Sequence, residues 1–172
     1  MTTTPFHDLN DYLAVPRVGG LRLSPDGTWL AASVQTLSPD KKKKYLTSIW
    51  RIDAAGGPAR RLTRSAEGEG GARFLPDGSL LFTSKRPDPD SSKKDENGGS
   101  ALWLLPSGGG EARVIATLPG GASAVETAAG ADTVIVSSPV LAADAGDDKE
   151  KRKARKDAGV TAILHETVPV RH

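Results

Sequence analysis

"LRLSPDGTWLAAS", residues 21–33, and "ARFLPDGSLLFTS", residues 72–84, follow one pattern. In each stretch an apolar run leads into Pro-Asp-Gly, and a second apolar run follows. Proline fixes φ for a β-turn, aspartate accepts a hydrogen bond from a nearby backbone amide, and glycine tolerates the positive φ at which the chain reverses. Both stretches therefore predict a β-hairpin, and Asp26 and Asp77 are interpreted as turn residues.

The two hairpins belong to a longer repeat. Ser24 and Leu75, which precede the turns, are 51 residues apart, and Trp50 and Trp103, which follow them, are 53 residues apart. Repeats of this length, each with several short strands, are typical of the blades of a β-propeller. We therefore expect a repeat of four-stranded units.

A third, weaker copy lacks both the Pro-Asp-Gly turn and the tryptophan. "TVIVSS" at residues 133–138 takes the place of the second strand, and "VTAILHE" at residues 160–166 takes the place of the third. The fold class that we expect is all-β, a partial β-propeller of about three four-stranded blades. Residues 1–19 are expected to form a lead-in segment, either a short cap helix stopped by Pro16 or an extended stretch. The expected blades cover residues 20–64, 72–117 and, incompletely, 122–172.

Four strands are expected in each complete copy, at residues 20–23, 28–34, 48–53 and 59–63 and then at 73–75, 79–84, 101–105 and 112–117. In every copy a polar insertion separates the second strand from the third. These insertions should lie on one side of the propeller, because a blade's second-to-third and fourth-to-first connections emerge on the same face. The third insertion has the composition of a short helix that ends at Gly159.

Composition excludes several classes of protein. The 172 residues contain no cysteine and carry a formal net charge of only +2, which gives no reason to expect a nucleic-acid partner. The basic runs at residues 41–44 and 149–156 are interpreted as solvated loops or a short exposed helix. The sequence shows no secretory leader and no apolar run long enough to cross a membrane, so we expect a soluble, cytoplasmic protein without a membrane partner.

Catalytic residues are not expected in this chain. Ser100 and Ser123 follow glycines but lack the second glycine of the G-x-S-x-G nucleophile turn. His7, His165 and His172 have no serine in a catalytic sequence context to act on. Each histidine is interpreted as a surface or strand-end residue.

Metal and cofactor sites are not expected either. Residues 144–148, "DAGDD", are too short for a calcium loop and lack its terminal glutamate. No other pair of histidine, aspartate or glutamate has ligand spacing on a predictable element. We therefore predict no catalytic, cofactor-binding or metal-binding residue, and no cofactor.

Three features together resemble a known family. They are the lead-in "DLNDYLAVPRV" at residues 8–18, the "LSPDG" hairpin with its following "IW" or "LW" strand, and above all "KRKARKDAGVTAILHETVPVR" at residues 151–171. This combination resembles the amino-terminal propeller of serine peptidases of the prolyl oligopeptidase family (S9), in particular acylaminoacyl-peptidase-like and dipeptidyl-peptidase-like members. The resemblance runs from about residue 6 to the end of the chain.

The resemblance implies a two-domain enzyme. In this family the propeller precedes an α/β-hydrolase domain that carries a Ser-Asp-His triad, and it admits short peptides while it excludes folded proteins. The chain would then be a noncatalytic fragment, with its own hydrolase domain and short peptide substrates as partners. The alternative is a freestanding TolB-like propeller module that binds proteins and has no hydrolase. An incomplete ring leaves sheet edges exposed, so we also expect self-association.

Overall fold

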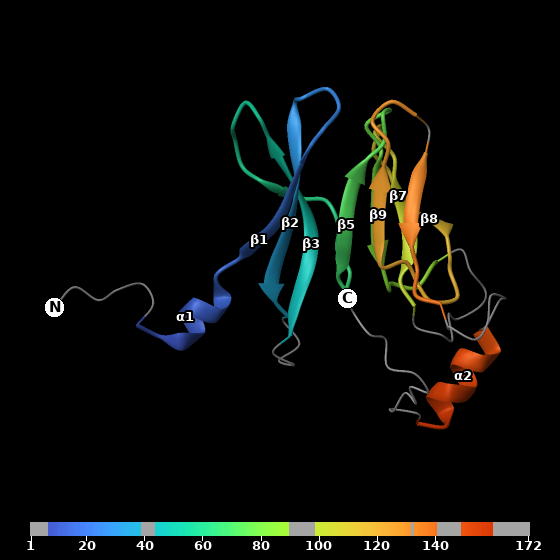
Figure 1. Cartoon of the computed structure of the whole chain (residues 1–172). Coiled ribbons are helices and arrows are strands. Elements are labelled where there is room, and N and C mark those ends of the chain that lie inside the picture. Colours follow the sequence, from blue (N-terminus) through green and yellow to red (C-terminus); the bar gives the residue numbers. More distant parts are fainter. Residues whose placement is uncertain (1–6, 39–43, 90–98, 132, 141–148, 160–172) are drawn as a thin grey trace, which may run out of the picture.

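A computed structural model describes residues 7–38, 44–89, 99–131, 133–140 and 149–159 of the chain. Antiparallel β-structure dominates this part, with one short helix near each of its ends (Figure 1). The described strands form two four-stranded sheets and one two-stranded sheet. The predicted all-β fold class is confirmed: the sheets stand beside one another as the blades of a partial β-propeller.

The first sheet pairs consecutive strands in the order β1 (Arg17–Leu23), β2 (Trp29–Leu37), β3 (Tyr45–Asp53) and β4 (Arg60–Arg61). The β1–β2 hairpin turns at Gly27, whose φ is 69° and whose N–H donates to the Ser24 carbonyl at 2.9 Å. A residue with a Cβ is strained at this φ, so the turn requires glycine. The first predicted hairpin is confirmed, although β1 begins at Arg17 instead of Gly20.

The second sheet repeats this meander with β5 (Glu69–Phe74), β6 (Leu80–Ser84), β7 (Ala101–Leu105) and β8 (Arg113–Ala116). Its turn residue Gly78 has a φ of 82°, and its N–H donates to the Leu75 carbonyl at 3.0 Å. The second predicted hairpin is therefore confirmed as well.

The third sheet consists of β9 (Ala124–Thr127) and β10 (Val134–Ser137), which pair antiparallel. Strand β10 lies within the stretch 133–138 predicted as the second strand of the third copy. The strand predicted at residues 160–166 lies outside the described residues. The described part thus contains two complete four-stranded blades and the first two strands of another.

A pair of glycines interrupts the first strand of each complete sheet. The ladder between β1 and β2 shifts register between Val18 and Gly20, and the ladder between β5 and β6 shifts between Gly70 and Arg73. Gly71 has a φ of 64°, and a Cβ there would lie 3.5 Å from a methyl carbon of Val125. Such β-bulges leave an extra residue without a ladder partner. They allow both strands to begin earlier than the sequence predicted.

The core lies between the sheets. Phe82 and Trp103 of the second sheet are fully buried, with ring centroids 6.4 Å apart and planes 16° apart, and they pack against Ala31 and Ile49 of the first sheet. On the other face of the second sheet, residues Leu81 and Leu102 meet Val125 of β9. Each interface joins two neighbouring sheets, so the sheets stabilise one another by burial of their apolar faces.

One face of the first sheet has no such cover in the described residues. Leu21 and Leu23 on this face of β1 are 48% and 58% exposed. Trp50 lies opposite Ala32 on the same face, as Trp103 lies opposite Phe82 in the second sheet. The two tryptophans therefore occupy equivalent positions, but Trp103 is fully buried and Trp50 is only half-buried.

Both helices agree with the sequence analysis. Helix α1 (Leu9–Ala14) begins where the Asp8 carboxylate accepts from the Asn10 N–H at 2.8 Å, and it ends before Pro16. Helix α2 (Lys149–Asp157) is followed by Gly159, with a φ of 62°, whose N–H donates to the carbonyl of Lys156 at 3.1 Å. The lead-in segment thus contains a short helix, and the third insertion contains the predicted one.

The polar insertions begin and end on one side of the sheets. Residues at the end of the first insertion (Tyr45 to Thr47) line the same pocket as Lys85 and Ser100 from the ends of the second. Gly99 also lines a pocket with Arg152 of α2, which lies below the sheets in Figure 1. The described parts of all three insertions therefore share one side, as predicted.

Candidate functional site

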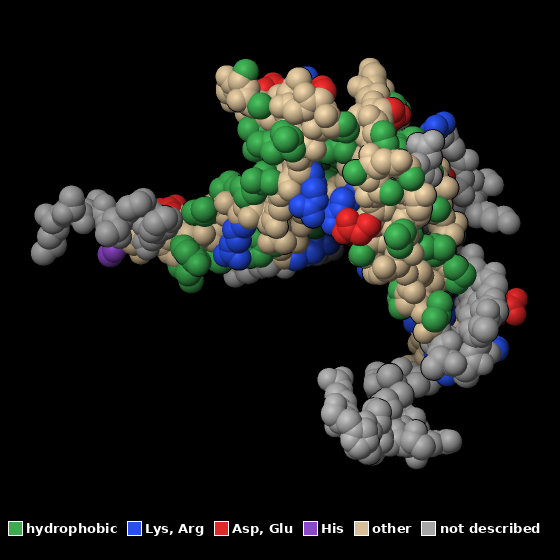
Figure 2. Space-filling view, turned by 45° about the horizontal axis from the view of Figure 1, so that its top comes forward, with side chains coloured by type: hydrophobic (Ala, Val, Ile, Leu, Met, Phe, Trp, Pro, Cys, Tyr) green, Lys and Arg blue, Asp and Glu red, His purple; other side chains and the backbone are tan. Residues whose placement is uncertain are grey.

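The innermost strands of the three sheets, β1, β5 and β9, place a charged residue at one repeated position. Arg22, Arg73 and Glu126 each stand one residue before the last ladder pair of their hairpin. Because β1, β5 and β9 are the first strands of successive blades, these side chains form a row from blade to blade. Figure 2 shows basic and acidic side chains meeting in the middle of the visible face, between the first two sheets.

The row contains one ion pair, between the second and third blades. Arg73 donates from Nε to Glu126 Oε2 at 2.7 Å and from Nη2 to Oε1 at 2.5 Å. The hydrogen bonds from Arg73 lower the pKa of Glu126, and Glu126 raises the pKa of Arg73. The Glu126 side chain is 63% exposed, so we expect the pair to align the blades more than to stabilise them.

Arg22 has no equivalent partner. Its Nη1 donates to the Leu21 carbonyl at 2.8 Å, and it forms no ion pair with a described residue. It lines a groove of about 200 Å³ between β1 and β5, together with Ser33, Arg73 and the glycines of both bulges. Its lining contains two arginines, Arg22 and Arg73, and no acidic residue.

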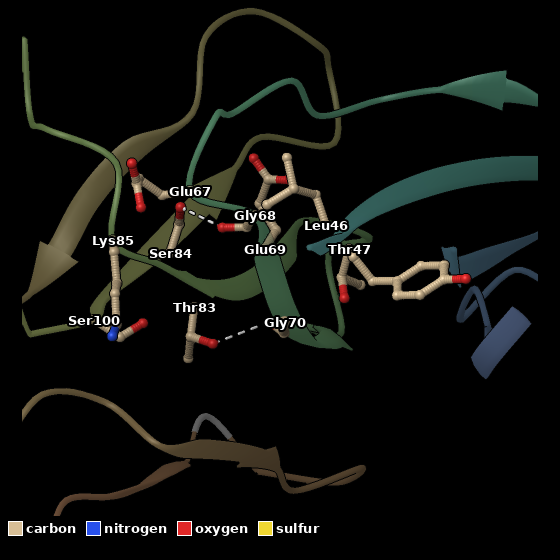
Figure 3. A pocket seen from close by; sticks show the side chains of 11 residues that line it. Leu46, Thr47, Glu67, Gly68, Glu69, Gly70, Thr83, Ser84, Lys85 and Ser100 are labelled. Atoms are coloured by element: carbon tan, nitrogen blue, oxygen red, sulfur yellow. Dashed lines mark hydrogen bonds between the residues drawn. The ribbon is translucent and has the colours of Figure 1, made fainter. Parts of the chain in front are cut away.

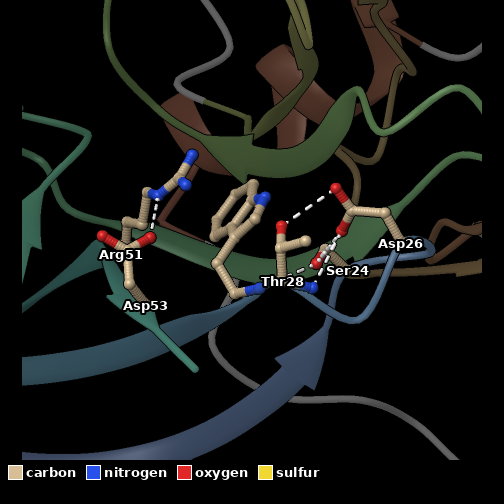
Figure 4. Close-up of polar contacts among 6 residues, drawn as sticks. Ser24, Asp26, Thr28, Arg51 and Asp53 are labelled. Atoms are coloured by element: carbon tan, nitrogen blue, oxygen red, sulfur yellow. Dashed lines mark hydrogen bonds and ion pairs between the residues drawn. The ribbon is translucent and has the colours of Figure 1, made fainter. Parts of the chain in front are cut away.

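The Pro-Asp-Gly turns of both blades line a second, larger cleft of about 500 Å³ on the side opposite the insertions. In it the Asp26 carboxylate accepts from Ser24 Oγ at 2.6 Å, from the Thr28 N–H at 3.0 Å and from Thr28 Oγ1 at 2.9 Å (Figure 4). These hydrogen bonds, that from Ser24 first, lower the pKa of Asp26. Asp77 likewise accepts from the N–H and the hydroxyl of Ser79. Both carboxylates accept hydrogen bonds from residues of their own turns, as the sequence predicted.

Arg51 lies at the edge of this cleft. Its Nε donates to Asp53 Oδ1 at 2.6 Å, and its guanidinium lies 4.8 Å from the centre of the Trp29 ring (Figure 4). The Trp29 ring in turn meets Phe74 of the second sheet edge to face. Arg51 is therefore held by contacts within the protein, and the cleft offers little unpaired charge.

A third pocket, of about 210 Å³, opens on the insertion side (Figure 3). Glu69 lies at its wall and is only 4% exposed. Its Oε2 accepts from Thr63 Oγ1 at 3.0 Å, and Thr63 Oγ1 accepts from the Ile49 N–H at 2.9 Å. Its Oε1 is buried and has no hydrogen-bond partner within the described part of the chain. Burial raises the pKa of Glu69, because removal from water disfavours the charged form of its carboxyl group.

Among the described serines and histidines weighed in the sequence analysis, no hydrogen bond joins Ser100 or Ser123 to His7. Ser123 Oγ donates to the Ser137 carbonyl at 2.9 Å, and the Ser100 carbonyl accepts from the Ala122 N–H at 2.6 Å. His7 is exposed ahead of α1, while His165 and His172 lie outside the described residues. The described residues include no cluster of three potential metal ligands. Neither of the described helices is long and apolar enough to cross a membrane.

Sequence reasoning did not single out Glu69 or the row of Arg22, Arg73 and Glu126. A signal for the row was present, because Arg22 and Arg73 stand at the same place in the two quoted repeats, "LRLSPDG" and "ARFLPDG". The third copy lacks the Pro-Asp-Gly turn, so its matching glutamate could not be aligned by eye. For Glu69 no local signal exists, because its burial depends on a neighbouring sheet.

Comparison with known proteins places the chain near a peptidase. It is 27% identical over 143 residues to an uncharacterized peptidase, YuxL, of Bacillus subtilis (strain 168). The match covers 83% of this chain but only 20% of that relative, so the chain spans a fifth of its length. No family model matches the chain.

Among solved structures, a putative TolB from Agrobacterium tumefaciens is similar, with 26% sequence identity and a TM-score of 0.40. The similarity covers 57% of this chain and 32% of that chain. The chain is thus similar to part of a peptidase, and its own sheets define it as a propeller module.

Proposed function

We propose that this chain is the noncatalytic propeller part of a serine peptidase of the prolyl oligopeptidase type, which controls the access of short peptides to an α/β-hydrolase domain in a longer protein. The observation that carries the proposal is the match to a peptidase, which covers 83% of this chain and 20% of that relative. A match that covers only a fifth of that relative fits one part of a larger enzyme.

The packing of the blades supports a role in access control. An assembly that excludes substrates by size needs walls that do not open readily. Here Phe82 and Trp103 of the second sheet are buried against the first sheet. Leu81 and Leu102 of the second sheet pack against Val125 of the third. The ion pair between β5 and β9 fixes the inner edge of the second interface. These contacts hold neighbouring blades together.

The first experiment identifies the catalytic serine. The longest natural protein that contains this chain is treated with a fluorophosphonate probe, which labels activated serines, and the labelled peptide is identified by mass spectrometry. We expect one labelled serine outside residues 1–172, in a G-x-S-x-G context. Stoichiometric labelling of a serine within residues 1–172, or of none anywhere, would overturn the proposal.

The second experiment tests access control in the same protein. Cleavage is measured for peptides of increasing length with a common cleavage site, and for folded and unfolded protein substrates that carry this site. We expect short peptides to be cleaved and protein substrates to resist. Equal cleavage of all substrates would refute access control and leave the serine assignment intact. A compact monomer of 18.0 kDa as the whole gene product would instead favour a freestanding binding module.

A further inference from the structure

The repeat leaves one charge of the inner row without its counterpart. Arg73 faces the third blade, where the equivalent residue is Glu126, and the two form a bidentate ion pair. Arg22 holds the same position in the first blade and faces the second, where the equivalent residue is Arg73. Like charges at neighbouring positions repel each other unless an anion lies between them.

The space beside Arg22 has room for such an anion. Gly19, Gly20 and Gly71 line the groove, so no side chain fills it at the bulges. A bulge also leaves backbone groups outside the regular ladder. Ser33 pairs with Gly20 in the β1–β2 ladder and also lines the groove, and its hydroxyl oxygen lies 3.9 Å from the position that a Cβ on Gly20 would take. The groove therefore offers the Ser33 hydroxyl as a hydrogen-bond donor, and the glycines leave its backbone accessible to a ligand.

The charges around the groove favour a singly charged ligand. Arg22 is exposed, and one of its N–H groups already donates to the carbonyl of Leu21. Arg73 is largely neutralised by Glu126, which also lies close enough to Arg22 for that arginine to lower the pKa of Glu126 slightly. About one positive charge remains. A planar carboxylate matches the fork of a guanidinium and carries one negative charge.

We propose that Arg22, with the glycine-lined groove between β1 and β5, is a binding site for the carboxylate of a peptide. That the ligand is a peptide rests on the proposed function; the carboxylate chemistry rests on the groove. The carboxylate belongs either to the C-terminus of the peptide or to an acidic side chain. In the peptidase, the site would hold one end of a substrate at the inner strands of the propeller.

Binding is measured by calorimetry on the longest natural protein that contains this chain, after its serine has been inactivated with a fluorophosphonate. Four peptides are compared: trialanine, its C-terminal amide, a glutamate-containing peptide amide and the matching glutamine-containing amide. The variants are Arg22→Gln and, as the control, Arg60→Gln, which removes the same charge from the exposed outer strand β4. Melting temperatures are recorded for both, and Arg22→Lys separates charge from geometry.

We expect Arg22→Gln to weaken the binding of a carboxylate peptide about tenfold, as loss of a charge-assisted hydrogen bond does. The two amides that lack a carboxylate should bind equally to the wild-type protein and both variants, and Arg60→Gln should bind every peptide as the wild type does. A loss confined to trialanine identifies the C-terminus as the ligand, and a loss confined to the glutamate peptide identifies the side chain. Arg22→Lys should recover part of the affinity.

The proposal is overturned if carboxylate and amide peptides bind the wild-type protein equally or not at all. It is also overturned if Arg22→Gln and Arg60→Gln weaken binding alike, because that result means a general effect of charge. The fluorophosphonate and cleavage assays are separate: a protein without peptidase activity that still binds carboxylates through Arg22 refutes the proposed function and retains the site.

Discussion

Trp103 and Trp50 provide a matched pair that tests whether a further blade covers the open face of the first sheet. The Trp103 side chain is fully buried between the first two sheets, stacks on Phe82, and carries the Arg86 guanidinium 3.8 Å from its ring centre. Replacement by alanine removes these contacts and leaves a cavity, so Trp103→Ala should lower the free energy of unfolding by about 3–5 kcal/mol.

Trp50 holds the equivalent position in the first sheet, but its face is open in the described part of the chain. Its Nε1 donates to Ser48 Oγ at 3.0 Å, and its ring is half-buried. If a blade of the same kind packs against this face in the longer protein, Trp50→Ala should also cost about 3–5 kcal/mol there. If water covers the face, the cost should be about half as large, in proportion to the area buried.

The assay is urea unfolding, monitored by circular dichroism, of the longest natural protein that contains this chain. Both alanine variants and the wild type are measured side by side. Equal costs would show that the first sheet is covered as the second is. A cost below about 1 kcal/mol for Trp103→Ala would refute the packing described for the second sheet. A cost for Trp50→Ala well below that for Trp103→Ala would refute closure by a further blade.

Three further predictions follow from the turns, the buried carboxylate and the open faces. Gly27→Val should destabilise the protein by about 1–3 kcal/mol, measured by thermal melting, because valine is strained at positive φ; Asp26→Asn should cost less, and the reverse order would refute the turn assignment. Burial raises the pKa of Glu69, so the wild type should lose stability relative to Glu69→Gln as the pH rises from the ordinary pKa of glutamate through the raised pKa. The melting temperatures of the two proteins are compared at several pH values, and a difference in melting temperature that does not change with pH would contradict this. The isolated chain should form oligomers or unfold in size-exclusion chromatography with light scattering, whereas a compact, cooperatively melting monomer would contradict exposed blade faces.

The hairpins and the order of the strands were predictable because their determinants are local. Proline, aspartate and glycine fix each turn through φ preferences and hydrogen bonds within a few residues. The tryptophans mark the third strands for a similar reason, since apolar aromatic runs favour buried strands. Strand boundaries were less accurate. The fourth strand was expected at residues 59–63, but only Arg60–Arg61 pairs as a ladder, because the N–H groups of both Leu62 and Thr63 turn to the Ile49 carbonyl.

The earlier starts of β1 and β5 have a signal in the sequence, a pair of glycines ahead of each hairpin. Gly19 and Gly20 precede the first hairpin as Gly70 and Gly71 precede the second. The two pairs are 51 residues apart, the same separation as between the two turns. In the structure these pairs form the bulges that prolong both strands. Glu69 is different in kind. Its environment comes from Thr63 and the neighbouring sheet, and no pattern of nearby residues reveals such a contact.

The charged residues of the inner row are paired differently at the two interfaces between the described sheets. The complete blades repeat the turn residues and the strand tryptophan, which fold each sheet in the same way. The inner row repeats as arginine in the two complete blades, at Arg22 and Arg73, and changes to Glu126 in the third sheet, which also lacks the turn residues and the tryptophan. A purely structural row would gain most from the same complementary pairing at each interface. Here only the second interface is paired, and the first places two guanidinium groups beside a glycine-lined groove. The sheets thus share a common scaffold, while the charges on their inner strands differ from one interface to the next.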